Sequence, residues 1–242
     1  MAQKQLGQLW GVGVGPGDPE LITLKAARLL QTAPVVAFPA GRDGNPGIAE
    51  SIVSDLLQPD QIRLALYFPY VQETTALQTA WQKAAEAVWT HLAIGRDVIF
   101  ATEGDASFYS TFTYLAQALQ QYYPKAIVQT VPGVCSPLAA AAILGEPLTI
   151  LTQRLTVLPA LYRVTDLETA LDQSDRVVLM KVASVYPLVW QVLKQRCLLA
   201  QSSVVVRATQ PSQQVYRNLE TYPDLDLPYF SLLMVHCQPS IR

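Results

Sequence analysis

GVGVGPGDPE, residues 11–20, begins with glycines that alternate with valines. Its second half contains two prolines and two acidic residues, a composition typical of a turn. We expect a buried strand over Leu9–Val14, directly before the turn. Asp18 is a favourable helix N-cap and Pro19 suits a first helical turn, so a helix is predicted from here to about Gln31. Strand, tight turn and helix together predict one β-α unit.

The glycine turn of this unit has two interpretations. Gly15 and Gly17 would let a ligand approach the backbone, whose amides could donate to its polar atoms. The spacing is not the dinucleotide pattern GxGxxG, because Pro16 splits the turn. The alternative is a turn that only closes the β-α unit, and these ten residues alone favour neither.

Two later segments repeat the same strand-turn-helix pattern. In DVIFATEGDASFYSTF (Asp97–Phe112), Val98–Ala101 is predicted as a strand, followed by an acidic turn and helix from Ser107 onward. VPGVCS (Val131–Ser136) follows another apolar run and precedes an alanine-rich helix, Pro137–Leu144. Loops of this kind emerge at the carboxyl edge of a parallel sheet, where open sheets bind ligands.

Composition narrows the classes of protein that this chain can represent. Its 242 residues are half apolar and 15% charged, which is typical of a globular protein with an ample core. Its apolar runs are too short and interrupted to span a bilayer, and MAQKQLGQLW does not resemble a signal peptide. A net charge of −2 without a basic stripe argues against nucleic-acid binding. Scattered Cys135, Cys197 and Cys237 favour a reducing cytoplasm and show no metal-ligand spacing.

The order of predicted elements indicates an α/β fold with two domains. The first half alternates strand and helix, which predicts a mostly parallel sheet covered by helices. Gly145-Glu146-Pro147 is a turn signal, so we expect an N-terminal α/β domain over 1–145 and an α+β domain over 146–242. Further predicted strands are Val35–Phe38, Ile62–Leu66, Ala126–Val131, Leu155–Leu158, Val177–Val182, Val204–Ala208 and Phe230–Val235; further predicted helices are Ile48–Leu57, Leu77–Ile94 and Phe112–Gln121.

The three glycine and acidic loops together resemble the tetrapyrrole methylase family. RLTVLPALY (154–162), VVLMKVAS (177–184), RATQPSQQV (207–215) and PYFSLLMV (228–235) resemble the branch that methylates C-20 of precorrin-2 or cobalt-factor II. The resemblance implies methyl transfer from S-adenosylmethionine, with S-adenosylhomocysteine as product, in cobalamin biosynthesis. It also implies two lobes with cofactor and substrate in the trough between them, and a homodimer.

The resemblance further implies a set of cofactor contacts. For Asp105 the alternative role is a helix N-cap, and both roles can coexist. The family often has Gly-Asp-Pro at this turn, and Ala106 stands here in place of the proline, which leaves the turn less restricted in φ. For Met180 the alternative is core packing. The implied contacts are Pro16, Glu103, Gly104, Asp105, Phe108, Cys135, Ser136, Met180, Ala208, Thr209 and Gln210.

A tetrapyrrole substrate carries many carboxylates, so a local basic rim is expected. Candidates beside the later motifs are Arg154, Arg163, Lys181 and Arg207, each of which could instead be a solvated surface charge. The aromatic run Tyr67–Tyr70 could line a flat substrate or close a strand against the core.

No residue is assigned as catalyst. Cys135 has no histidine near it in sequence. For His91 and His236 we expect a surface or core position rather than a catalytic role. Some family members carry an aspartate after the second strand, where this chain has Pro39. Alternative functions remain open: methylation of another corrinoid position, of ribosomal RNA or of a translation-factor side chain, or a non-catalytic nucleotide-binding module. We expect no metal bound by the protein.

Overall fold

The computed structural model describes residues 5–41, 45–69 and 73–237. The chain divides into two compact units, Met1–Cys135 and Ser136–Arg242. The sequence-based boundary was placed at Gly145, so the alanine-rich helix that we had grouped with the first half belongs to the second unit. Each unit is described by itself.

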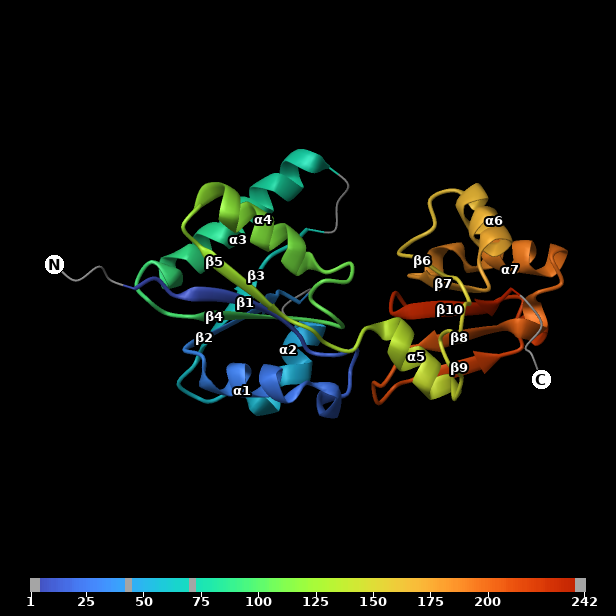
Figure 1. Ribbon diagram of the computed structural model, residues 1–242, viewed down its shortest axis with the longest axis horizontal. Helices are drawn as coiled ribbons and strands as arrows, with labels where there is room; N and C mark the ends of the chain where they lie inside the picture. The colour runs from blue at the N-terminus through green and yellow to red at the C-terminus, as the bar shows by residue number, and fades with distance from the viewer. Residues whose placement is uncertain (1–4, 42–44, 70–72, 238–242) are drawn as a thin grey trace. The chain divides into compact units, whose positions relative to one another are not determined.

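The first unit is built on a parallel five-stranded sheet with the order β3-β2-β4-β1-β5 (Figure 1). Every strand was predicted from sequence to within one residue at each end. The strands are β1 (Gln8–Gly13), β2 (Val35–Pro39), β3 (Ile62–Leu66), β4 (Val98–Thr102) and β5 (Ile127–Val131). The helices are α1 (Leu24–Thr32), α2 (Ile48–Val53), α3 (Thr74–Leu92) and α4 (Thr111–Tyr122).

Helices cover both faces of this sheet, as Figure 1 shows. Successive strand side chains point to opposite faces. Phe100 therefore packs with α3 and α4, whereas its neighbour Ile99 packs with α1 and α2. On the first of these faces, Gly11 makes room for the ring of Phe112, because a Cβ there would come within 2.2 Å of it. The strands are consequently buried on both sides, which explains their continuous apolar runs.

The first helix begins later than predicted. Asp18 caps only a single 3-10 turn, Pro19–Leu21, by accepting a hydrogen bond from the Glu20 amide at 2.9 Å. The chain then returns to extended backbone, and Thr23 becomes the N-cap of α1 by accepting from the Ala26 amide at 3.2 Å. The prediction of one helix from Asp18 was therefore wrong, because a second capping residue lies five positions further on.

The helix expected from Ser107 onward also begins later. Tyr109 has a left-handed backbone with φ 52°, which stops helical geometry at this point. Ser110 is the N-cap of α4 and accepts a hydrogen bond from the Phe112 amide at 3.1 Å. Asp105 is consequently not the cap of this helix, and its side chain is directed to other partners.

The second unit contains a mixed five-stranded sheet with the order β6-β7-β10-β8-β9. Strand β10 is antiparallel to both of its neighbours, so β7 and β8 run in the same direction. The sequence analysis missed β9, α6 and α7. The strands are β6 (Leu155–Leu158), β7 (Arg176–Met180), β8 (Ser202–Val206), β9 (Gln214–Arg217) and β10 (Ser231–His236), and the helices are α5 (Ser136–Leu144), α6 (Val164–Gln173) and α7 (Tyr186–Gln195).

The core of the second unit lies between this sheet and helices α6 and α7. Leu167 of α6 and Leu193 of α7 are fully buried against the strands. Two larger side chains of α7 each bring one polar atom into this core, and each of these atoms has a hydrogen-bond partner. Trp190 Nε1 donates to the Leu219 carbonyl at 2.8 Å, and the Tyr186 hydroxyl donates to the Tyr222 carbonyl at 2.6 Å. Burial raises the pKa of Tyr186 to about 12, so this hydroxyl keeps its proton.

Candidate functional site

The first unit has a topological switch point between β1 and β4. These strands are neighbours and parallel, yet the chain leaves β1 toward α1 on one face and leaves β4 toward α4 on the other (Figure 1). The carboxyl edge beside such a switch point is where open α/β sheets bind ligands.

The loops after β1 and β4 are joined by a backbone bridge between two glycines. Gly15 N donates to the Gly104 carbonyl at 3.1 Å, and Gly104 N donates to the Gly15 carbonyl at 2.8 Å. Both residues have left-handed backbones, with φ 79° and 67°. Glycine is the residue that adopts this conformation without strain, so the glycines are required by the bridge itself.

The third loop, after β5, packs against the other two through glycine. A Cβ on Gly133 would come within 2.3 Å of the Gly104 carbonyl oxygen, and one on Gly13 within 2.7 Å of the Gly133 amide nitrogen. Three backbones thus meet without side chains between them. A Cβ on Gly104 itself would lie in ordinary contact, 3.8 Å from the Cys135 Cα, so crowding does not exclude a side chain there.

Asp105 ties the second and third loops together. Its Oδ1 accepts hydrogen bonds from the amide and hydroxyl of Ser107, and its Oδ2 accepts from the Gly133 amide at 2.8 Å. Partial burial on its own would raise the pKa of this carboxyl, but the hydrogen bonds from Ser107 and Gly133 outweigh it and lower the pKa. The carboxylate is therefore charged at neutral pH and fixes the loop geometry.

The cofactor residues implied for the first unit are brought together by these loops. Pro16 follows the first bridging glycine, and Glu103 and Asp105 flank the second. Cys135 is adjacent to Gly104, whose Cβ position lies 3.8 Å from the cysteine Cα. Phe108 lies further along the same loop and packs edge-on against Tyr109, with ring centroids 4.7 Å apart.

The implied cofactor residues of the second unit lie at one edge of its sheet. Met180 ends β7, and Ala208, Thr209 and Gln210 follow β8, which runs in the same direction. The start of β10 lies between them: Arg207 N donates to the Phe230 carbonyl at 2.7 Å. Ser136 is the first residue of α5.

Backbone strain is concentrated at this edge. Lys181, Arg207 and Thr209 have φ of 54°, 47° and 64°. A β-branched residue such as Thr209 rarely adopts this region, and such residues gather at ligand-binding segments. Strands β7 and β8 therefore end earlier than the Val177–Val182 and Val204–Ala208 predicted from sequence, because the left-handed residues break the pairing.

Of the four basic residues expected near substrate, the structure groups two. Lys181 and Arg207 lie at the edge just described, where Lys181 Nζ is 5.6 Å from the centre of the Tyr229 ring. Arg163 forms an ion pair with Asp166 at 2.7 Å. Arg154 precedes β6, which runs parallel to β7, and so lies at the opposite edge.

The aromatic run at residues 67–70 divides between two environments. Phe68 packs edge-on against Phe100 in the core, with ring centroids 6.2 Å apart. Tyr67 is 71% exposed and lines a hollow of about 570 Å³ between the end of β3 and α3. Tyr70 lies outside the described residues.

Neither histidine is placed as a catalyst by its surroundings. His91 lies in the last turn of α3, where burial and then Arg96 lower its pKa. His236 is bonded to Glu146 at 2.7 Å in the second unit.

Across residues 5–41, 45–69 and 73–237 there is no grouping of three or more histidine, cysteine or acidic side chains that could hold a metal ion. Among the same residues, every helix is too short or too polar to cross a bilayer.

Comparison with known proteins assigns the chain to a family. The model of the Tetrapyrrole (Corrin/Porphyrin) Methylases matches residues 8–222. The cobalt-precorrin-2 C(20)-methyltransferase of Salmonella typhimurium is 36% identical over 96% of this chain and 97% of its own length. The precorrin-2 C(20)-methyltransferase of a Sinorhizobium species is 35% identical over 97% of each. A longer relative, the cobalamin biosynthesis protein CobIJ of Mycobacterium tuberculosis, is 38% identical, and the chain spans 46% of it.

Solved structures show the same fold. A cobalt precorrin-4 methyltransferase aligns over 96% of both chains with a TM-score of 0.74 at 22% identity. A uroporphyrin-III C-methyltransferase from Thermus thermophilus, complexed with S-adenosylhomocysteine, aligns over 95% of this chain with a TM-score of 0.65 at 23% identity. The family model, the full-length relatives and the shared fold agree, and the chain belongs to the tetrapyrrole methylase family.

Proposed function

We propose that this protein transfers the methyl group of S-adenosylmethionine to C-20 of precorrin-2 or its cobalt-containing form, in cobalamin biosynthesis. The observation that carries the proposal is the match along almost their whole length to two methyltransferases named for that position, at 36% and 35% identity. The longer CobIJ supports the same pathway.

The loops of the first unit are the proposed cofactor site. The proposed contacts are backbone groups of the residues next to the Gly15–Gly104 bridge, together with the carboxylate of Glu103. Such groups suit the polar parts of S-adenosylmethionine, and the absence of a side chain on Gly104 would let a ligand come close to the backbone. Asp105 is committed to three hydrogen bonds within the protein, so we assign it the role of holding the loops in place.

The cofactor supplies a methyl group on a positively charged sulfur, which leaves without acid catalysis. The protein's contribution is to hold the acceptor carbon in line behind that methyl group, and restricted geometry of this kind supplies about 7–11 kcal/mol. We assign part of this positioning to the strained edge of the second unit. Lys181 and Arg207 are proposed to bind carboxylates of the macrocycle, and the backbone of residues 208–210 is proposed to contact the cofactor.

The test is a methyl-transfer assay on a panel of acceptors. Purified protein is incubated with labelled S-adenosylmethionine and precorrin-2, with and without cobalt, and the products are separated by mass spectrometry. The proposal predicts a singly methylated tetrapyrrole and an equal amount of S-adenosylhomocysteine. Label in ribosomal RNA or in protein, and none in the tetrapyrrole, would contradict it.

We further propose that the enzyme works in the cytoplasm as a homodimer, as the resemblance to the family implies. Sedimentation velocity at several protein concentrations tests the assembly. A species of monomer mass across the whole concentration range would contradict it.

A further inference from the structure

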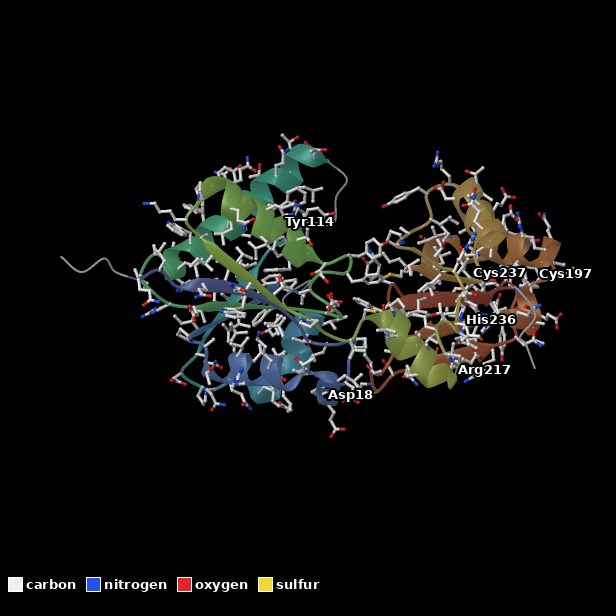
Figure 2. The ribbon with its side chains drawn as sticks, in the orientation of Figure 1. Asp18, Tyr114, Cys197, Arg217, His236 and Cys237 are labelled. Carbon is white, nitrogen blue, oxygen red and sulfur yellow. The ribbon has the colours of Figure 1, made fainter. Side chains whose placement is uncertain are left out.

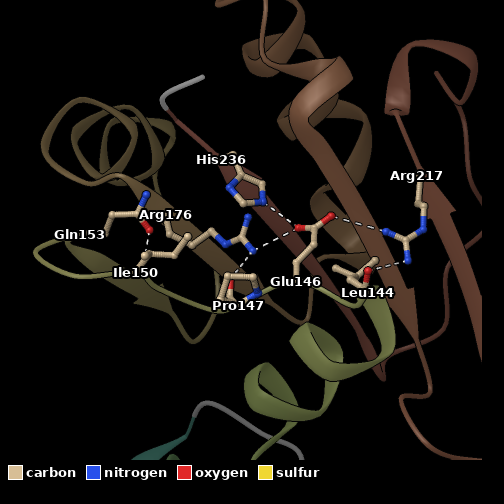
Figure 3. Close-up of polar contacts among 8 residues, drawn as sticks. All are labelled: Leu144, Glu146, Pro147, Ile150, Gln153, Arg176, Arg217 and His236. Carbon is tan, nitrogen blue, oxygen red and sulfur yellow. Dashed lines mark hydrogen bonds and ion pairs between the residues drawn. The ribbon is translucent and has the colours of Figure 1, made fainter. Parts of the chain in front are cut away.

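A single carboxylate, that of Glu146, joins two arginines and a histidine in the second unit. Glu146 Oε2 lies 3.2 Å from Arg176 Nη2 and 2.7 Å from His236 Nε2, and its Oε1 lies 3.5 Å from Arg217 Nη1 (Figure 3). Figure 2 shows Arg217 on β9 and His236 at the end of β10, while Arg176 begins β7. Glu146 itself follows the end of α5, so it connects this helix to three strands.

Arg176 makes the cluster depend on the charge of Glu146. Its side chain is 2% exposed, and within the described part of the chain its Nε and Nη1 atoms have no hydrogen-bond partner. Burial lowers the pKa of its guanidinium, and Glu146 opposes that effect. Besides Glu146, Arg176 Nη2 donates to the Pro147 carbonyl at 2.9 Å. Loss of the carboxylate would therefore leave a buried cation without an opposite charge.

The same cluster holds the end of α5 directly. Arg217 Nη2 donates to the carbonyl of Leu144, the last residue of the helix, at 2.8 Å. A cation at a helix C-terminus also interacts favourably with the helix dipole. The end of α5 is thus fixed twice, by the Arg217 bond to its final carbonyl and by the Glu146 pairs one residue beyond Gly145.

The other end of α5 leads into the proposed cofactor site. The helix begins at Ser136, one residue after Cys135, and the loop before it contains Gly133, the partner of Asp105. Five of its nine residues are buried, so the helix cannot turn or slide without disturbing its packing. A displacement at Leu144 would accordingly be carried to Ser136.

We propose that Glu146 is a positioning residue for cofactor binding, which fixes the C-terminal end of α5 and thereby the place of Ser136 at its other end. This inference rests on the proposed function, because it takes Ser136 to be a cofactor contact. Glu146 itself does not touch the cofactor. Its effect depends on charge, since a neutral isostere retains the shape but leaves Arg176 and Arg217 without the opposite charge of Glu146.

The experiment is calorimetric titration of the full chain with S-adenosylhomocysteine, at a temperature where circular dichroism shows each variant to be folded. Glu146→Gln is compared with Asp166→Asn, which removes the exposed ion pair to Arg163 in the same unit. We expect Glu146→Gln to raise the dissociation constant roughly fivefold or more with an unchanged number of sites. Asp166→Asn should leave both quantities unchanged.

The titration separates positioning from stability. If Glu146→Gln binds at fewer sites with an unchanged dissociation constant, Glu146 is merely structural and the inference is overturned. Should that variant fail to fold, Arg217→Gln removes the bond to Leu144 while Arg176 keeps its partner, and it must also raise the dissociation constant. Absence of binding by the unaltered protein would overturn the proposed function itself, whereas equal dissociation constants in all proteins would overturn this inference alone.

Discussion

Asp105 in the first unit and Glu146 in the second do the same structural task with different partners. Each carboxylate joins segments that are distant in sequence. Asp105 accepts hydrogen bonds from neutral amides and a hydroxyl, while Glu146 faces two arginines and a histidine. The first arrangement stabilises a negative charge in a glycine-lined junction, and the second stabilises a buried positive charge, that of Arg176. The two should therefore respond differently to substitution and to pH.

The largest effect should come from filling the glycine junction. Gly133→Ala would place a Cβ 2.3 Å from the Gly104 carbonyl oxygen and 2.6 Å from the Gly13 carbonyl carbon, so backbone on one side or the other would have to shift. We expect a loss of about 3 kcal/mol in the free energy of unfolding of the first unit. Chemical denaturation measures it, with Gly145→Ala as the control.

Gly145, the control position, is also a glycine in a turn, but no atoms crowd its Cβ position as they do at Gly133. Gly145 has φ 66° and open space around its Cβ position, so alanine there meets only conformational strain of about 1 kcal/mol. Equal losses in the two variants would show that close packing of the three loops is not what the glycines provide.

Neutralising Glu146 should rank second. Glu146→Gln leaves Arg176 buried beside a neutral amide, and we expect a loss of about 2 kcal/mol in the second unit, reduced because Glu146 is 34% exposed. Asp166→Asn breaks the exposed pair to Arg163 and should leave stability nearly unchanged. Comparable melting curves for both variants would contradict the charge-dependent role of Glu146.

Asp105→Asn should have a smaller effect that depends on pH. The folded state lowers the pKa of Asp105, so its carboxylate contributes stability above the pKa of the unfolded chain and loses it as pH falls through the lower folded value. We expect the variant to be about 1 kcal/mol less stable at neutral pH. That difference should shrink below about pH 4, near the ordinary aspartate pKa. A constant difference from neutral to acid pH would remove the charge from the explanation.

His236 should give the smallest effect, and its contribution to stability is likewise lost as the pH falls, in a higher pH range. Burial and then Arg176 lower its pKa in the folded state, although Glu146 raises it. The unfolded chain therefore takes up the proton first, and stability falls as pH decreases through about 6.5. His236→Gln keeps a donor toward Glu146 and should flatten this decline by less than about 1 kcal/mol. An identical decline in both proteins would assign the effect to other groups.

The sequence predicted the first unit better than the second for a physical reason. Parallel strands buried on both faces leave continuous apolar runs, which is why β1 to β5 were placed within a residue. Helix starts were less certain, because Asp18 and Asp105 compete with Thr23 and Ser110 as caps and only the three-dimensional turn decides between them. In the second unit, β9 is short and exposed, with no apolar alternation strong enough to reveal it.

The candidate site was also only partly predictable from the sequence. The three loops were recognisable because glycine and acidic residues stand at the ends of strands. The bond from Gly133 to Asp105 was not, since 28 residues separate them. Glu146 was read only as part of a turn, because its partners lie 30, 71 and 90 residues away. Clusters of charge assembled by topology leave no local pattern in a sequence.

The position of the transferred methyl group tests the central claim most directly. Precorrin-2 is converted with S-adenosylmethionine carrying an isotopically labelled methyl group, and the product is analysed by nuclear magnetic resonance. The proposed function predicts a single labelled methyl on C-20, formed together with S-adenosylhomocysteine. A labelled methyl at any other ring carbon, or release of S-adenosylhomocysteine without label in the macrocycle, would contradict it.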